Sequence, residues 1–384
     1  MRKKASASAV AGELATPRAS TPRATADATA RFAARFASRL GKGFYRPGPN
    51  GVSVSAMGVG TYLGECDDAD DTRYTETIAR AIASGVNLLD TAVNYRCQRS
   101  ERAVGAAIQR TIDSGDAERE ALVVCTKGGY IPLCDHVPAS REEYQSYLKR
   151  EFYDPGIMAP DDVIAGGHSI APSFLKHTVA LSRRNLGVRT IDVYYLHNPE
   201  QQAAGLSPQS FRQRLRAAFM VLEDAVSRGE LGVYGCATWN GFRLPPGAKG
   251  HMSLYELVEL AHEVAGDGHH FRVVQMPINL GMPEALREPT QPVGKRGTLV
   301  PALEAATSLG LVVVASASLM QAQLTHDLPI SVRALFPTQQ TDAQRALAFV
   351  QSLPGLTAAL VGMRRGEHLT ENLEAAARAS AAST

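Results

Sequence analysis

The stretch Val86-Asn-Leu-Leu-Asp90-Thr-Ala-Val-Asn-Tyr95 joins an apolar run to a carboxylate and then to a tyrosine. Lys127 ends a second apolar run, and His197 ends a third. Each of these short runs predicts a buried β-strand. A barrel of parallel strands collects the carboxyl ends of its strands on one face, where barrel enzymes hold their catalytic groups. We therefore expect these four polar side chains to converge on one site.

Short apolar runs alternate with helix-like periods along most of the chain. Buried parallel strands read as continuous apolar runs, and the connections between them need helices. A succession of strand–helix units predicts an α/β fold, a single (β/α)8 TIM barrel, with an open doubly wound sheet as the alternative. The eight expected strands lie at 56–59, 86–90, 122–126, 191–196, 231–236, 273–276, 311–315 and 358–361.

The chain divides into two regions at about residue 42. Residues 43–384 are expected to form the barrel, introduced by an N-terminal β-hairpin whose turn is Asn50-Gly51, a pair typical of short turns. Residues 1–42 form a basic tail with nine Lys or Arg against two acidic residues, a net charge of +7. The whole chain carries only +2, so the remainder carries −5.

The tail contains two kinds of sequence. Residues 1–30 are rich in Ala, Ser, Thr and Pro, and a segment with so few large apolar side chains is expected to be disordered. Phe32, Phe36 and Leu40 recur every four residues, which predicts a short basic amphipathic helix. The tail resembles an organelle transit peptide. The alternatives are a mobile leader or a helix packed on the barrel; without targeting, the protein is expected to be cytoplasmic.

Composition excludes several classes of function. A mildly acidic body without a basic stripe argues against nucleic-acid binding. The chain lacks an apolar stretch of about 18 residues, so no membrane span is expected. Five scattered cysteines indicate reduced thiols. Cys97, two residues after Tyr95, is interpreted as a partly buried inert thiol, with an oxidation-sensitive site as the alternative. His269-His270 lacks further ligands, so no metal site is predicted.

The four strand-end residues suit the reduction of a carbonyl group. Tyrosine, with a pKa near 10, is a poor acid at neutral pH, but a neighbouring ammonium makes its phenol a better proton donor. Lys127 supplies that charge to Tyr95, and Asp90 holds the lysine in place. His197 orients the carbonyl oxygen and stabilises its alkoxide character.

The strings Gly58-Val-Gly60-Thr61-Tyr62 and Ser100-Glu101-Arg-Ala-Val-Gly105, together with the four strand-end residues, resemble the aldo-keto reductases from about residue 44 to 379. The resemblance implies an NADP(H)-dependent oxidoreductase that reduces an aldehyde, ketone or sugar carbonyl, with Tyr95 as the proton donor. A Rossmann fingerprint is rejected, because Leu63 stands where that motif needs glycine.

The resemblance also implies that the cofactor binds to loops at the barrel mouth. Two arginines at a helix start suit a ribose 2′-phosphate, which favours NADP over NAD. The residues assigned to the cofactor in this way are Gly60, Thr61, Thr238, Asn240, Gln275, Arg364, Arg365, Glu371 and Asn372.

Two long connections, 129–172 and 277–298, are expected to shape substrate specificity, and the first to cover the pocket. The aromatic residues predicted to line the substrate pocket are Tyr62, Tyr130 and Trp239. The expected partner is a small carbonyl or sugar molecule. Two alternatives stay open: a sugar or lactol dehydrogenase working in the oxidative direction, and a non-enzymatic subunit that senses the cofactor. The sequence predicts no oligomeric state.

Overall fold

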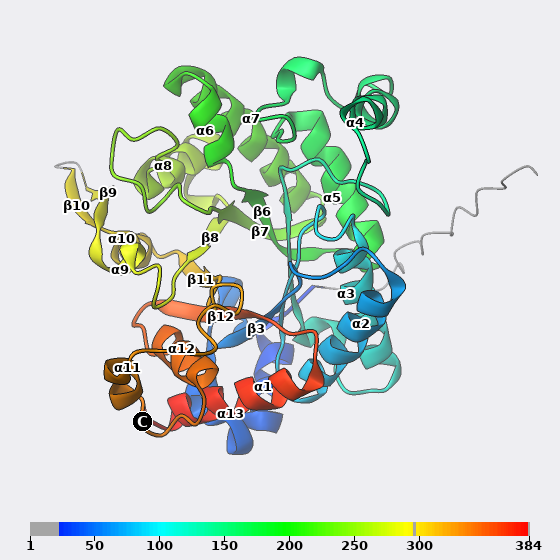
Figure 1. Cartoon of the computed structure of the whole chain (residues 1–384). Coiled ribbons are helices and arrows are strands. Elements are labelled where there is room, and N and C mark those ends of the chain that lie inside the picture. The colour runs from blue at the N-terminus through cyan, green and yellow to red at the C-terminus, as the bar shows by residue number, and fades with distance from the viewer. Residues whose placement is uncertain (1–22, 295–296, 383–384) are drawn as a thin grey trace, which may run out of the picture.

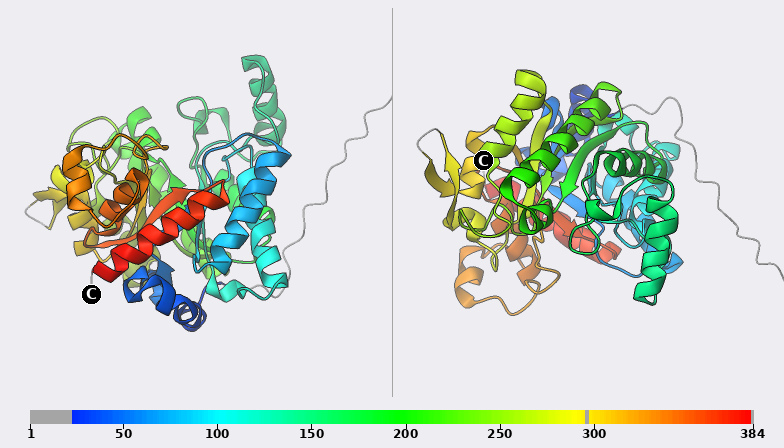
Figure 2. Two further views of the ribbon diagram at one scale, coloured as in Figure 1. Left: turned by 60° about the horizontal axis from the view of Figure 1, so that its bottom comes forward. Right: turned by 90° about the horizontal axis from the view of Figure 1, so that it is seen from above.

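The computed structural model describes residues 23–294 and 297–382. Parallel strands close into a barrel in the order β11-β12-β3-β4-β5-β6-β7-β8, and helices surround it (Figures 1 and 2). The predicted (β/α)8 barrel is confirmed, and the open sheet is wrong. The barrel strands are β3 (Met57–Gly60), β4 (Leu88–Asp90), β5 (Val123–Gly128), β6 (Ile191–His197), β7 (Leu231–Ala237), β8 (Phe271–Pro277), β11 (Val312–Ser316) and β12 (Leu356–Gly362).

The helices that follow these strands form the outer layer. They are α2 (Asp68–Ala83), α3 (Arg99–Asp113), α5 (Pro172–Leu186), α7 (Pro208–Ser227), α8 (Leu254–Ala265), α10 (Ala302–Ser308), α12 (Asp342–Gln351) and α13 (Gly366–Ala382). Shorter helices interrupt the connections: α4 (Arg141–Leu148), α6 (Glu200–Gly205), α9 (Glu284–Arg287) and α11 (Ile330–Leu335). Within the described ranges, no helix is both long and apolar enough to cross a membrane.

Two antiparallel hairpins flank the barrel sheet. The predicted N-terminal hairpin is confirmed as β1 (Tyr45–Pro47) paired with β2 (Ser53–Ser55). Its turn holds Asn50 and Gly51 at positive φ, 55° and 77°, as the turn chemistry requires. The long connection after β8 contains the second hairpin, β9 (Pro289–Val293) with β10 (Thr298–Pro301).

Alternation along the strands separates two apolar cores. Side chains such as Leu88, Val193 and Val273 fill the barrel interior, whereas Leu89, Tyr194 and Val274 pack outward against the helices. Neighbouring residues on a strand point to opposite faces, so each strand serves both cores. This packing holds the strand ends in fixed positions around the barrel mouth.

Two glycines allow unusually close backbone approach. A β-carbon on Gly235 of β7 would lie 1.6 Å from the Val273 carbonyl oxygen of β8. A β-carbon on Gly105 of α3 would lie 2.8 Å from the carbonyl oxygens of Asn185 and Leu186 on α5. The Gly105 in the Ser100-to-Gly105 string is therefore a helix-packing position.

The structure corrects the prediction for the N-terminal tail. Helix α1 (Ala26–Leu40) begins inside the segment expected to be disordered, with Thr25 as its N-cap. The predicted amphipathic pattern is confirmed, because Phe32 and Leu40 are buried in the outer core. Residues 1–22 lie outside the described residues, and their predicted disorder stays a prediction.

The basic face of α1 also contacts the barrel body. Arg31 donates to the Glu118 carboxylate at 2.6 Å, Arg35 to the Asp116 carbonyl oxygen at 2.7 Å, and Arg39 to the Ser84 carbonyl oxygen. Of the alternatives for this segment, the helix packed on the barrel is the one observed. Helix α1 lies beside α13 at the foot of the view in Figure 1.

A buried ion pair closes the amino-terminal end of the barrel. Asp192 of β6 accepts hydrogen bonds from Arg119 Nη2 at 2.7 Å, the Val124 amide at 2.8 Å and the Ala24 amide at 2.6 Å. Arg119 also donates to the carbonyl oxygens of residues 122 and 190. Both side chains are almost fully buried, so each charge depends on the other.

Replacing Arg119 by alanine is expected to lower the free energy of unfolding by about 3–5 kcal/mol, because it leaves the Asp192 charge buried and uncompensated. Chemical denaturation measures the change. Arg31→Ala is the matched control, since Arg31 and Glu118 are 64% and 50% exposed and such pairs contribute about 1 kcal/mol or less. Equal losses in the two variants would contradict this role of Arg119.

Candidate active site

Asp90 is the centre of the polar cluster at the barrel mouth. It ends β4, and its Oδ1 accepts a hydrogen bond from Lys127 Nζ on β5. Its Oδ2 accepts from Gln275 Nε2 on β8 at 2.9 Å. Lys127 donates a further bond to the Thr91 carbonyl oxygen at 2.8 Å. One carboxylate therefore joins three strands, and the predicted contact between Asp90 and Lys127 is observed.

Burial and charge act against each other in this pair. Burial alone would lower the pKa of Lys127, but the Asp90 carboxylate outweighs it and the pKa is raised. Lys127 therefore remains an ammonium. Burial raises the pKa of Asp90, and the lysine opposes that shift.

Tyr95 lies in the loop that follows β4, next to this pair. Lys127 Nζ is 5.1 Å from the centre of the Tyr95 ring. Burial raises the pKa of Tyr95, and the Lys127 charge works against that rise. The phenol is thus protonated near neutral pH, with a cation beside it that stabilises the phenolate left after proton loss.

His197 completes the predicted group of four. Its ring centre is 5.6 Å from that of Tyr95, in an edge-to-face arrangement. Burial, followed by the Lys127 charge, moves the pKa of His197 well below its usual value of 6.5. A neutral imidazole donates one hydrogen bond and accepts another, so His197 can hold a carbonyl oxygen. The structure brings all four predicted residues together.

Two of the three predicted pocket aromatics contact this group. The Tyr62 ring lies 5.1 Å from the Tyr95 ring and is 57% exposed. The Tyr130 ring lies 5.0 Å from the His197 ring, and its hydroxyl accepts from Asn198 Nδ2 at 3.1 Å. The mouth therefore offers aromatic rings in edge-to-face contact and one hydrogen-bonded hydroxyl to a small molecule.

The third, Trp239, follows β7 and is held through its backbone. Glu200 Oε1 accepts from the Trp239 amide at 2.6 Å and from the Asn240 amide at 3.0 Å. The Trp239 side chain is 43% exposed. Asn240 turns its side chain to Arg243 at 3.1 Å. Glu200 was not predicted, since nothing in a helix-start glutamate indicates that it will bind a distant loop.

The sequence also missed His168, which lies at the end of the long 129–172 connection. Its Nε2 bonds to the His197 carbonyl oxygen at 2.7 Å, and its ring lies 5.1 Å from Tyr130. Gln202 Nε2 approaches the other ring nitrogen at 3.1 Å. His168 thus holds the end of β6 in place.

Most of the 129–172 connection packs away from the mouth. The π-helical turn Lys149–Tyr153, which follows α4, carries Phe152, whose ring lies 5.9 Å from that of Phe174 on α5. Its two ends reach the polar cluster, through Tyr130 and His168. Coverage of the pocket by the rest of the segment stays a prediction.

Apart from Asn240, described above, the predicted cofactor residues fall into two groups. Gly60, Thr61, Thr238 and Gln275 lie at strand ends around the mouth, where Gly60 is paired with both Asp90 and Gly362. The remaining group lies at the start of α13. There Arg364 donates to Asp70 at 2.7 Å, Glu371 accepts from Thr341, and Arg365 is exposed. Asn372 is buried in the same helix.

Several features suit a nicotinamide dinucleotide. Thr238 Oγ1 is buried and lacks a hydrogen-bond partner within the described part of the chain, as expected of a group that binds a polar ligand. Arg80 Nη1 lies 1.9 Å from where a β-carbon of Gly366 would be, so a further guanidinium covers the start of α13. Arg80 was not predicted, because it lies on α2 far away in sequence. The charge of this region fits a phosphate group.

In residues 23–294 and 297–382, no group of three or more His, Cys, Asp or Glu side chains is placed to hold a metal ion.

The mouth thus combines a tyrosine, a charged lysine and a neutral histidine at one end of a parallel barrel. Comparison with known proteins gives a family likeness for this arrangement. A sequence model described as the aldo/keto reductase family matches residues 56–243. Over these residues, close to half of the chain, the sequence is similar to the aldo/keto reductase family.

Two characterised relatives each match about half of this chain. The NADH-specific methylglyoxal reductase of Escherichia coli (strain K12) is 26% identical over 195 residues, 50% of either chain. The D-threo-aldose 1-dehydrogenase of a Pseudomonas species is 26% identical over 189 residues, 48% of this chain and 50% of the relative. The chain therefore spans about half the length of the curated relatives that it matches.

Solved structures support the fold over a longer range. An aldo/keto reductase from Klebsiella pneumoniae, in complex with NADP and acetate, has a TM-score of 0.55 at 19% identity, covering 85% of this chain and 87% of its own. The glycerol dehydrogenase of Gluconobacter oxydans has a TM-score of 0.57 at 18% identity, with 87% and 90% covered. The likeness shows a shared barrel.

His168 makes stability depend on pH. Burial lowers its pKa from 6.5 to about 4. Between these values the unfolded chain binds a proton that the folded chain does not, so stability falls as the pH falls. Unfolding measured from about pH 7 to pH 4 is expected to show that the parent protein loses about 3 kcal/mol more than His168→Gln. If the free energy of unfolding fell equally with pH in the two proteins, the lowered pKa of His168 would be contradicted.

Proposed function

We propose that this protein reduces the carbonyl group of a small aldehyde, ketone or sugar with NADPH, and that Tyr95 is the proton donor. The observation that carries the proposal is the group Tyr95, Lys127, Asp90 and His197 at one end of the barrel. Such a group supplies what carbonyl reduction needs from a protein: a proton, a charge that eases its release, and a partner for the oxygen.

The cofactor, when bound, supplies the hydride. The side chains perform the remaining steps. His197 and Tyr95 hold the carbonyl oxygen between them, and the Tyr95 hydroxyl transfers its proton to that oxygen as negative charge develops. Lys127 stabilises the resulting phenolate, and Asp90 keeps Lys127 charged and directed at Tyr95.

Replacing Tyr95 by phenylalanine is expected to lower kcat by about 100-fold or more, since general-acid help is typically worth about 10²–10⁴ in rate. The measurement is NADPH oxidation against a panel of aldehydes, ketones and aldoses. NADPH affinity, followed by fluorescence titration, is expected to change by only a few-fold, because Tyr95 acts on the substrate. Tyr153→Phe, in the distant π-helical turn, is the matched control. Full turnover in Tyr95→Phe would reject the proposed donor.

The preference for NADPH rests on the arginines at the start of α13. Arg365 is exposed there, while Arg364 is already paired with Asp70. Arg365→Ala is expected to weaken NADPH binding by about tenfold and to leave NADH binding unchanged, since only NADPH carries the 2′-phosphate. Parallel titrations with the two cofactors measure the ratio. If the NADH-specific relative is the better guide, the wild-type protein binds NADH at least as tightly as NADPH and Arg365→Ala leaves the ratio unaltered.

A second candidate function is the oxidation of an aldose at its first carbon. The similarity to a D-threo-aldose 1-dehydrogenase favours it. The same residues serve in reverse, with Tyr95 accepting the proton of a sugar hydroxyl. Assays in both directions separate the two candidates.

A further inference from the structure

Two cysteines meet beside the proposed proton donor. Cys97 lies two residues after Tyr95, and Cys66 lies in the loop between β3 and α2, four residues after Tyr62. Their Sγ atoms are 3.3 Å apart, and both thiols are free. A disulfide bond is about 2.05 Å long, so a movement of little more than 1 Å would join them.

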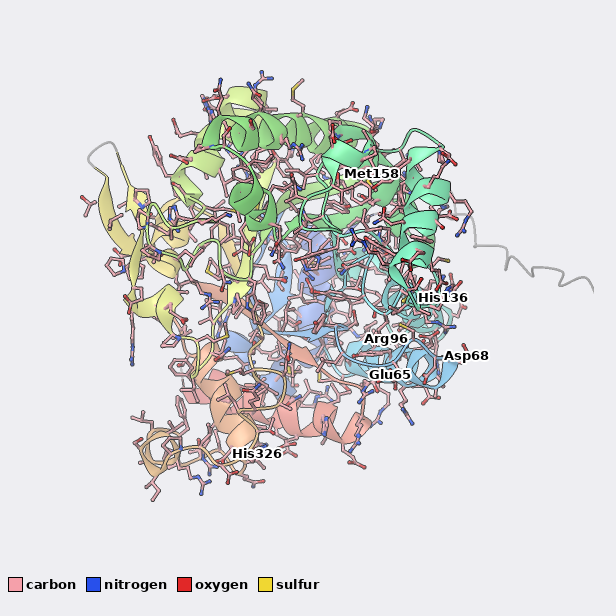
Figure 3. All side chains as sticks on the ribbon, turned by 45° about the horizontal axis from the view of Figure 1, so that its top comes forward. Glu65, Asp68, Arg96, His136, Met158 and His326 are labelled. Atoms are coloured by element: carbon pink, nitrogen blue, oxygen red, sulfur yellow. The ribbon has the colours of Figure 1, made fainter. Side chains whose placement is uncertain are left out.

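Arg96, which directly precedes Cys97, holds the loop of Cys66 next to Cys97. Arg96 Nε donates to the Glu65 carbonyl oxygen at 2.7 Å, and Arg96 Nη2 donates to the Asp67 carbonyl oxygen at 3.2 Å. Arg96 and Glu65 lie next to each other in Figure 3. One buried guanidinium therefore binds the backbone on either side of Cys66. These two hydrogen bonds hold the loop of Cys66 against the residue next to Cys97, and so keep the two sulfur atoms close together.

The backbone at Cys97 is unusual. Arg96, Cys97 and Gln98 have φ values of 48°, 53° and 69°, three consecutive residues in the left-handed region without a glycine. This conformation is costly for such residues and persists only where surrounding contacts impose it. Here it turns the Cys97 side chain toward the Cys66 loop, directly after the tyrosine of the site.

The two thiols differ in access. Cys97 is 4% exposed, and burial, with the Cys66 thiol beside it, raises its pKa to about 12. Cys66 is half-buried, and residues 62–65, which precede it in the loop, are exposed. An oxidant from solution therefore meets Cys66 first, and Cys97 acts second. Cys134 is exposed in an adjacent loop, where the Asp135 amide bonds to the Cys97 carbonyl oxygen at 3.4 Å.

We propose that Cys66 and Cys97 form a reversible disulfide, an oxidation site that controls the geometry of the barrel mouth. With glutathione disulfide, the Cys66 thiolate attacks one sulfur and a glutathione thiolate leaves. Cys97 then loses its proton and attacks Cys66 Sγ, which releases the second glutathione thiolate. Two protein thiols are oxidised, and one glutathione disulfide is reduced to two thiols.

The disulfide draws the loop that carries Tyr62 toward the loop that carries Tyr95. These two rings already lie 5.1 Å apart, so the displacement reaches the proposed proton donor. A misplacement of about 1 Å at a reacting group can cost about 100-fold in rate. We expect the oxidised protein to turn over about 10–100-fold more slowly, and a dithiol reductant to restore it. This effect on turnover rests on the proposed function, whereas formation of the bond does not.

The experiment equilibrates the full chain with mixtures of reduced and oxidised glutathione and maps its peptides without reduction. The expected product is a peptide pair linked through Cys66 and Cys97. It disappears in Cys66→Ser, whose side chain lies in an exposed loop, and persists in the matched control Cys134→Ser. Both variants keep the basal activity of the reduced protein.

Three results would overturn the proposal: a lasting glutathione adduct on Cys66, a link from Cys66 to Cys134, or unmodified thiols at high oxidant. If the reduced protein is active, the disulfide forms, and the oxidised protein turns over at the same rate, the disulfide does not control the geometry of the barrel mouth. If the reduced protein is inactive towards every substrate, the proposed function fails, while the peptide map still decides whether the bond forms.

Discussion

Asp90 joins three strands of the barrel through a single carboxylate. One oxygen bonds to Lys127 on β5 and the other to Gln275 on β8, across the mouth from β4. An isolated charge at this depth would be costly, and the lysine and the amide both favour the ionised carboxylate against the rise in its pKa that burial causes. The same bonds direct the lysine at Tyr95. The stability of the barrel mouth and the proposed chemistry therefore depend on one set of contacts.

The strand ends were predictable because the barrel repeats one physical rule. A buried strand is largely apolar between its ends, so a charged or titratable residue at its carboxyl end marks the mouth. Asp90, Lys127 and His197 follow that rule, and the structure brings them together with Tyr95. Gly105 was also noticed in the sequence as part of the Ser100-to-Gly105 string. The structure shows why glycine stands there, since α5 passes too close for a β-carbon.

The supporting contacts could not be predicted. His168, Glu200, Arg80 and Arg96 act on groups that are distant in sequence, and each has an unremarkable local pattern. Gln275 was predicted for the cofactor, but its amide donates to Asp90 in the structure. The disorder of residues 1–30 was predicted from composition alone. Composition does not show that Phe32 and Leu40 pack on an apolar surface of the barrel. Tertiary packing supplies the stability that such a short helix lacks alone.

The packing of α1 has a consequence for any trimming of the chain. The Ala24 amide bonds to Asp192 inside the base of the barrel, and the helix after it covers apolar surface. A cut near residue 42 would leave α1 held only by its noncovalent contacts, among them those of the buried Phe32 and Leu40. A cut at or before residue 22 would leave every described contact of the barrel base intact. Helix α1 is therefore part of the folded body, and shortening of the chain that stops before Arg23 preserves it.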